Sequence, residues 1–207
     1  MESAAPVKAA VIYYSATGTV HSLALAAVEG AEKAGAQVRL RQVPETAPEA
    51  AIEARPDWAR HRGATADVPE AVVGDLDWAD VVLFGTPTRF GHVSAQLKAF
   101  IDTTGPLVFA GGLADKVYSA FTAADTAHGG PGSTLLTLGN VFYHWGGIIV
   151  PPGCTDPAPH GSANPFGPAP GPGQGPPGDV DLEAARYQAW RAVTTAAALN
   201  SGRGQPV

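Results

Sequence analysis

Apolar runs separated by polar, glycine-containing turns divide this chain into segments that alternate between strand and helix patterns. Three runs of mostly β-branched and aromatic residues are continuous, at residues 9–14, 81–85 and 116–122. Such runs are typical of strands that are buried on both faces of a parallel sheet. Residues 37–43 alternate polar with apolar positions and predict a half-exposed outer strand, and residues 148–150 predict a short last strand.

Apolar residues at helical spacing predict the segments between these strands. Helices are expected at residues 21–33, from the N-cap residue Ser94 to about residue 102, at residues 133–145 and at residues 181–199. Residues 44–76 carry several prolines and no long periodic run, so they predict a mostly irregular connection with a short helix near residues 49–54. The alternation predicts an α/β fold, a doubly wound parallel sheet with helices on both faces.

A turn rich in hydroxyl groups joins the first predicted strand to the first predicted helix. Residues 15–20 read SATGTV, with hydroxyls at Ser15, Thr17 and Thr19 around Gly18. Hydroxyl and backbone N–H groups converge on one anion in such turns, supported by the positive end of the helix dipole. The glycine patterns of triphosphatases and of dinucleotide folds are both missing here. The turn predicts a phosphate site, with an ordinary capped turn as the alternative.

Two further loops are expected beside this turn. Residues 86–91 and 123–132 follow the other two buried strands. The carboxyl ends of parallel strands meet at one edge of a sheet, and ligands bind there at the point where strand order reverses. The coincidence of three loops at that edge predicts a binding site.

Composition limits the class of protein and of partner. The chain has 207 residues, enough for a single domain, and a formal charge of −6 without a basic run, which argues against nucleic acid and membrane surfaces as partners. Cys154 is the single cysteine, so an internal disulfide is excluded, and no residue spacing indicates a metal site. No apolar run reaches the ~18 residues of a membrane span and no leader pattern is present, so a cytoplasmic protein is expected.

Glycine and proline are concentrated near the carboxyl terminus. Residues 151–178 hold many of the 25 glycines and 19 prolines. Because a helix pattern follows, this stretch is expected to be a surface excursion of a single domain over residues 1–207 rather than a tail. Residues 200–207 are expected to fray.

Five short motifs resemble one known family in collinear order. They are YYSATG at residues 13–18, VPET at 43–46, FGTPTRFG at 84–91, HWGGIIVPPG at 144–153 and ARYQ at 185–188. These motifs resemble the flavodoxin-like NAD(P)H:quinone oxidoreductases of the tryptophan-repressor-binding-protein type. The resemblance implies a five-stranded flavodoxin-like fold, an FMN cofactor and a homotetramer. It also implies two-electron, ping-pong hydride transfer from NADH or NADPH through FMN to a quinone or related aromatic acceptor.

Residues carried over from the family fall in the three loops and on one later helix. The cofactor-binding residues implied are Ser15, Ala16, Thr17, Gly18, Thr19, Val20, Pro87, Thr88, Arg89, Phe90, Gly91, Thr122, Ala123, Ala124, Asp125, Thr126 and His144. Val108, with Phe109 beside it, stands where the family has a tryptophan in its substrate pocket. No side chain is expected to act as a catalytic residue, since FMN supplies the redox chemistry.

Some positions depart from the family pattern or allow a structural role. Thr17 and Thr19 replace an aromatic residue and a histidine of the family. Arg89 is expected near the pyrimidine side of the flavin, with a surface or subunit ion pair as the alternative. His144 has an alternative role as a helix-end cation. The competing functions are a flavodoxin-type electron carrier, a specialised pathway flavin reductase and a non-catalytic oligomer.

Overall fold

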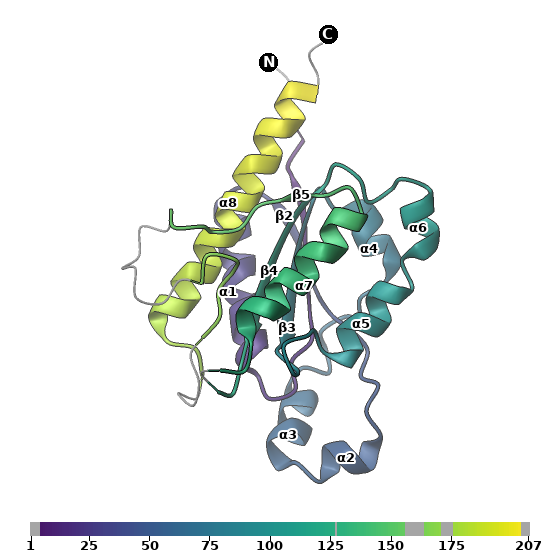
Figure 1. Ribbon diagram of the computed structural model, residues 1–207, viewed down its shortest axis with the longest axis vertical. Coiled ribbons are helices and arrows are strands. Elements are labelled where there is room, and N and C mark those ends of the chain that lie inside the picture. Colours follow the sequence, from purple (N-terminus) through teal and green to yellow (C-terminus); the bar gives the residue numbers. More distant parts are fainter. Residues whose placement is uncertain (1–4, 127, 156–163, 171–175, 204–207) are drawn as a thin grey trace.

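A parallel sheet of five strands forms the centre of the molecule (Figure 1). The computed structural model describes residues 5–126, 128–155, 164–170 and 176–203. The strands lie in the order β2-β1-β3-β4-β5, and they are β1 (Lys8–Tyr13), β2 (Gln37–Gln42), β3 (Val81–Pro87), β4 (Val117–Ala123) and β5 (Ile148–Ile149). The direction of winding reverses between β1 and β3, so the carboxyl ends of these two strands define the switch point of the sheet. The predicted α/β class and flavodoxin-like topology are confirmed.

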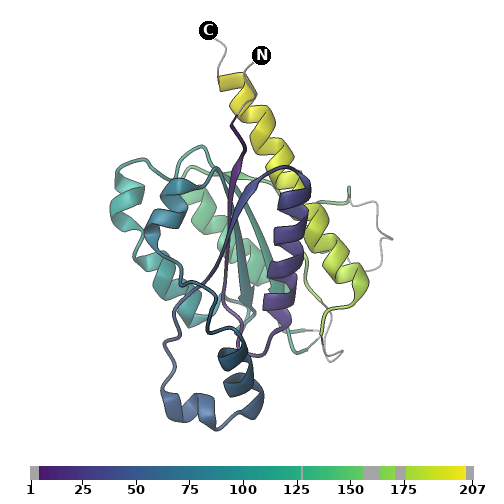
Figure 2. The same ribbon diagram turned by 180° about the vertical axis from the view of Figure 1, so that it is seen from behind.

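Two helical layers cover the two faces of the sheet (Figures 1 and 2). One face packs against α1 (Thr19–Lys33) and α8 (Asp179–Arg203). The other face packs against α4 (Val73–Trp78), α5 (Ala95–Asp102) and α7 (Pro131–His144), with the short α6 (Gly105–Phe109) beyond α5. Helices α1 and α8 approach so closely that a Cβ atom on Gly30 would lie 2.1 Å from the carbonyl oxygen of Arg186.

The long connection between β2 and β3 is more helical than the sequence predicts. The short helix near residues 49–54 is present as α2 (Glu49–Glu53), but α3 (Pro56–Ala64) and α4 were not predicted, and neither was α6. Helix α3 buries none of its residues, so its sequence has no apolar stripe from which a helix could be recognised. Helices α2 and α3 extend past the carboxyl edge of the sheet, at the bottom of Figure 1.

Part of the Pro/Gly-rich stretch lies against β4. The amide of Thr122 donates to the carbonyl oxygen of Pro168 at 2.9 Å. A Cβ atom on Gly167 would lie 2.1 Å from the carbonyl oxygen of Ala120, so only glycine fits there. Residues 156–163 and 171–175 of the predicted excursion lie outside the described residues. Helix α8 continues to Arg203, past its predicted end, and the last four residues also lie outside.

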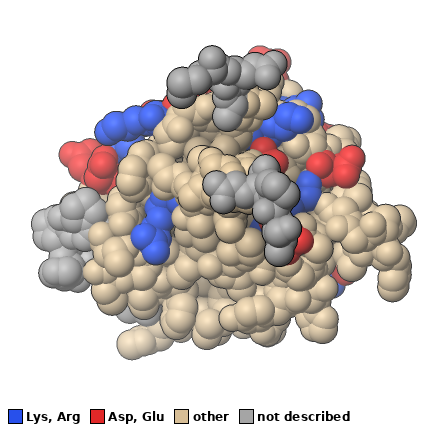
Figure 3. All heavy atoms as spheres, turned by 90° about the horizontal axis from the view of Figure 1, so that it is seen from above, with Lys and Arg blue, Asp and Glu red and all other residues tan. Residues whose placement is uncertain are grey.

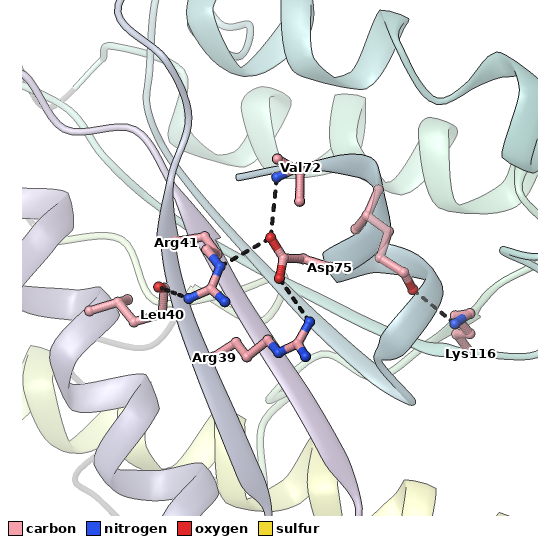
Figure 4. Close-up of polar contacts among 7 residues, drawn as sticks. Arg39, Leu40, Arg41, Val72, Asp75 and Lys116 are labelled. Carbon is pink, nitrogen blue, oxygen red and sulfur yellow. Dashed lines mark hydrogen bonds and ion pairs between the residues drawn. The ribbon is translucent and has the colours of Figure 1, made fainter. Parts of the chain in front are cut away.

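A buried carboxylate fastens α4 to the outer strand β2 (Figure 4). The Asp75 carboxylate accepts from Arg39 Nη1 and from Arg41 Nε, each at 3.1 Å, and from the amide of Val72 at 3.2 Å. The Lys116 ammonium donates to three carbonyl oxygens at the end of α4 and just after it, those of Leu76, Asp77 and Ala79. These contacts fix the end of the connection that carries α2 and α3.

Asp75→Ala is expected to lower the free energy of unfolding by about 2–3 kcal/mol, because it leaves two arginines without their carboxylate. Removing one partner of a fully buried ion pair costs about 3–5 kcal/mol of stability. The arginine side chains here are 36% and 21% exposed, so water solvates the unpaired guanidinium groups and the cost is smaller. Urea denaturation measures the change. Asp77→Ala, on the exposed side of α4, is the matched control. Equal shifts for both variants would contradict the anchoring role of Asp75.

Candidate functional site

A cavity of about 670 Å³ opens at the carboxyl edge of the sheet, at the switch point between β1 and β3. All three predicted loops contribute to its lining. The predicted residues that the structure brings together there are Ser15, Ala16, Thr17, Gly18, Thr19, Val20, Pro87, Arg89, Ala123, Ala124 and Asp125. A cavity of this size at a switch point is suited to a cofactor or other small ligand.

The phosphate-type turn has the geometry of an anion site. Gly18 is the N-cap of α1 with φ 108°, a left-handed conformation that glycine adopts without strain. The amides in the first turn of any α-helix lack intrahelical partners, and in α1, all of which is described, no side chain caps them. The hydroxyl of Ser15 accepts from the Gly18 amide at 3.1 Å and closes the turn. The open amides, with the Thr17 and Thr19 hydroxyls at the cavity lining, provide donors for one anionic group.

Thr88 and Thr122 lie beneath the cavity rather than in its lining. Both side chains are buried, and their hydroxyl oxygens are 3.1 Å apart. The Thr122 hydroxyl donates to the carbonyl oxygen of Thr86 at 2.6 Å, and the Thr88 amide donates to that of Ala123 at 2.8 Å. These two predicted cofactor residues therefore hold the β3 and β4 loops together.

The β3 loop places one cation at the cavity and one aromatic ring in solvent. The exposed Arg89 lines the cavity and has no carboxylate partner within the described part of the chain, so the alternative of a surface ion pair has no support there. Phe90 is 100% exposed and has φ 52°, an unfavourable value for an aromatic residue. Strain of this kind is concentrated at functional sites. Phe90, Gly91 and Thr126 do not line the cavity.

Three predicted site residues lie at the other end of the sheet. Val108 and Phe109 belong to α6 and His144 ends α7, near the amino ends of the strands, as the Asp115 amide bonded to the Gly146 carbonyl at 3.0 Å indicates. One chain does not bring these three residues to its own cavity. Their predicted role requires a second copy.

Sequence reasoning missed five residues that line the cavity from α1 and from α3 with its N-cap: His21, Ser22, Arg55, Asp57 and His61. The rings of His21 and His61 meet edge to face, with centroids 5.4 Å apart. His21 Nδ1 lies 2.6 Å from the Tyr13 hydroxyl, and a Cβ atom on Gly18 would lie 3.4 Å from His61 Nδ1. Nothing in the sequence pairs His61 with the turn, because α3 itself was not predicted.

Burial sets the charge of this histidine pair. It lowers the pKa of both His21 and His61, and repulsion from His21 lowers the pKa of His61 further. Burial also raises the pKa of Tyr13, so its hydroxyl keeps its proton. Since an ordinary histidine has a pKa of about 6.5, both rings are predominantly neutral at pH 7.

A second cavity of about 510 Å³ lies between α2, α3 and the ends of β1 and β2, and it meets the first at Ser15. Glu45 at its wall accepts hydrogen bonds from Tyr14, Trp58 and Gln96. Burial raises the pKa of Glu45, but hydrogen bonds from the amides of Ala47 and Thr46 and from the side chains of Gln96 and Tyr14 outweigh it and hold the pKa below its ordinary value. Glu45 thereby ties α3, through Trp58, to the end of β1.

Comparison with known proteins identifies the family of the chain. The family model described as NADPH-dependent FMN reductase matches residues 7–155. An NAD(P)H dehydrogenase (quinone) from Deinococcus radiodurans is 43% identical over 196 residues, which cover 94% of this chain and 98% of that protein. Another protein of the same name, from Syntrophus aciditrophicus, is 46% identical over 144 residues, covering 69% of this chain and 70% of that protein.

Solved structures support the same assignment. A WrbA-like flavodoxin from Agrobacterium tumefaciens is 26% identical and superposes with a TM-score of 0.66, covering 93% of this chain and 98% of that chain. A flavodoxin from the domain Archaea, 16% identical with a TM-score of 0.61, covers 92% of this chain and 99% of its own, and supports the fold alone. The chain therefore belongs to the NADPH-dependent FMN reductase family and, within it, to the flavodoxin-like NAD(P)H dehydrogenases (quinone).

Proposed function

We propose that this protein is an FMN-dependent NAD(P)H:quinone oxidoreductase. The observation that carries the proposal is the cavity at the switch point, into which an uncapped helix terminus and a hydroxyl-rich turn open. This donor set fits the phosphate of FMN, which amides and hydroxyls hold without a lysine. The identity to quinone dehydrogenases over nearly the whole chain supports the same reaction.

The chain's own residues bind and orient the reactants. Ser15, Thr17 and Thr19 would hold the phosphate of FMN, and the β3 and β4 loops line the rest of the cavity. When bound, FMN would supply the two-electron redox chemistry that links oxidation of NADH or NADPH to reduction of the quinone, with the proton for the hydroquinone coming from solvent. Arg89 at the lining favours negative charge on the bound ring. No side chain is needed as a proton-transfer catalyst, since positioning accounts for most of the rate.

Adding NADH or NADPH to the FMN-loaded protein under nitrogen is expected to bleach the flavin absorbance, and a quinone is expected to restore it. Donor and acceptor share one open side of the site, so steady-state kinetics should be ping-pong. Reductive titration separates this function from its main alternative, because an electron carrier takes up its two electrons in separate one-electron steps. Such separate steps, without bleaching by either nicotinamide, would overturn the proposal. Free FMN with each nicotinamide is the control.

We also propose a cytoplasmic homotetramer. Phe109 is 94% and Tyr143 is 73% exposed, both near the amino end of the sheet. Figure 3, which looks onto this end, shows a broad area without charged side chains. Large exposed apolar side chains favour an interface between copies, and a second copy is what Val108, Phe109 and His144 require to reach a cavity. Dependence on NADH or NADPH favours the cytoplasm.

Charge and hydropathy limit the other partners of the protein. None of the helices in the described ranges is long and apolar enough to cross a membrane. The formal charge of −6 disfavours nucleic acid. The acceptor class proposed is a quinone or a related aromatic compound, and a specialised pathway reductase with its own aromatic substrate is the second candidate.

A further inference from the structure

His21 and His61 lie beside the phosphate turn, and the proposed quinone chemistry does not use them. His21 comes from the first turns of α1 and His61 from α3, and both line the cofactor cavity. A Cβ atom on Gly18 would lie 3.4 Å from His61 Nδ1, so the ring of His61 covers the glycine that begins α1. The two rings are in edge-to-face contact. The pair therefore belongs to the end of the cavity where an anion would be held.

The fixed charges at this cavity balance before any ligand enters. Among the described lining residues, Arg55 and Arg89 are cationic and Asp57 and Asp125 are anionic. Arg55 is already paired with Asp57 at 2.9 Å. A phosphate dianion adds two negative charges, of which the helix dipole offsets about half of one. The remaining charge is unbalanced unless further positive charge appears.

The histidines are the groups at the cavity that can supply it. Tyr13, from β1, stays protonated because burial raises the pKa of its hydroxyl. Of the side-chain types in the lining, histidine alone has its ordinary pKa close to pH 7. The Tyr13 hydroxyl donates to Nδ1 of a neutral His21 and accepts from it when the ring is protonated. The 2.6 Å bond therefore persists in both charge states and holds the ring in place.

We propose that His21 and His61 are phosphate-recognition residues that take up protons from solvent as the phosphate of FMN binds. The inference rests on the proposed FMN site. Helix α3 holds His61 over the phosphate turn, and the hydrogen bond between Trp58 and Glu45 connects α3 to the end of β1. The pair selects phosphorylated flavin over riboflavin, because only the phosphate creates the negative charge that protonation balances.

The sign of the pH dependence follows from linkage. Without ligand both pKa values are lowered, and a neighbouring dianion raises them. Between the two sets of values, binding takes up protons, so FMN affinity falls as pH rises. If one proton is taken up per FMN, the dissociation constant of FMN rises by as much as about tenfold for each unit that the pH rises. A phosphate monoester has its second pKa at about 6, so above pH 7 the change comes from the protein. Riboflavin affinity should stay constant.

Calorimetry of FMN binding at pH 7, in two buffers with different heats of ionisation, tests the proposal. The apparent enthalpy should differ between buffers by an amount equal to about one proton or more taken up per FMN. The double variant His21→Gln/His61→Gln should take up close to none and should lose the pH dependence. His92→Gln, an exposed histidine outside the cavity lining, is the matched control. Riboflavin should show no buffer dependence with any of these proteins.

Wild-type protein alone already decides the outcome, so a double variant that folds poorly does not remove the test. FMN binding with the same heat in both buffers and a flat pH profile would overturn the proton uptake while leaving the FMN site intact. Proton uptake that persists in a folded double variant would assign it to other groups and would also overturn the proposal. A wild-type protein that binds neither FMN nor riboflavin would overturn the proposed function itself.

Discussion

Replacing Ser15 and Thr17 by alanine is expected to weaken FMN binding by about a hundredfold and riboflavin binding by less than about threefold. Each hydroxyl donates a hydrogen bond to a charged phosphate, and such a bond contributes about 1.5–3 kcal/mol. Two of them give at least about 3 kcal/mol, and about 1.4 kcal/mol corresponds to a tenfold change in affinity. Riboflavin lacks the phosphate, so it has nothing to lose at this turn.

Flavin fluorescence titration at constant pH measures both affinities. The Ser15 hydroxyl also accepts from the Gly18 amide, so its removal could loosen the turn itself. Thr17→Ala leaves that bond in place and is expected to weaken FMN binding by about tenfold on its own. Thr137→Ala, on α7 and outside the cavity, is the control for a removed hydroxyl. An equal loss of FMN and riboflavin would show that the phosphate is held elsewhere.

Tyr143→Asp is expected to convert a tetramer into smaller species and to lower quinone turnover by about tenfold or more. A carboxylate buried in an apolar interface without a partner is strongly unfavourable. Tyr143 is 73% exposed in the single chain and is not among the predicted site residues, so its loss reports on assembly rather than on the pocket. In the proposed tetramer Val108, Phe109 and His144 would reach the cavity of a neighbouring copy, so quinone turnover is expected to depend on assembly. FMN affinity, which depends on the chain's own turn, should change little.

Light scattering at micromolar concentration, with FMN present, gives the mass of the assembly. Wild-type protein should have four times the chain mass of 21.1 kDa. Val180→Asp, at the start of α8 and 44% exposed, is the control on the opposite layer and should remain tetrameric. A monomeric wild type, or dissociation by the α8 variant alone, would contradict the proposed interface.

Elements with a strong apolar pattern could be predicted from the sequence, and elements without one could not. The buried strands β1, β3 and β4 were found within a few residues because their burial on both faces leaves a continuous apolar run. Ser94 was expected as an N-cap, and its hydroxyl accepts from the Leu97 amide at 3.3 Å. Helix α3 buries none of its residues fully, and Trp58 is its one side chain packed against the core, so its residues carry no signal of helical spacing.

In the site too, features set by a single segment could be predicted, and features set by contacts between distant segments could not. The phosphate turn and the β3 and β4 loops follow from one local rule, that ligands bind where parallel strands end. The inward direction of Thr88 and Thr122 depends on how two loops pack together, which no single segment encodes. The meeting of His21 with His61 depends on the docking of α3 through Glu45, a contact made by tertiary structure alone. VPET was matched as a family motif, whereas its glutamate proves to be a hydrogen-bonding centre.

The contact of Gly167 and Pro168 with β4 bears on where this protein can be engineered. A run of proline and glycine is the usual choice for inserting a tag, a cleavage site or a longer linker. Residues 164–170 instead pack against β4, and a side chain at Gly167 would collide with the backbone of Ala120. An insertion there would pull on Thr122 and so on the β4 loop that lines the cavity. Cys154, exposed before that segment, offers a better point for attaching a probe.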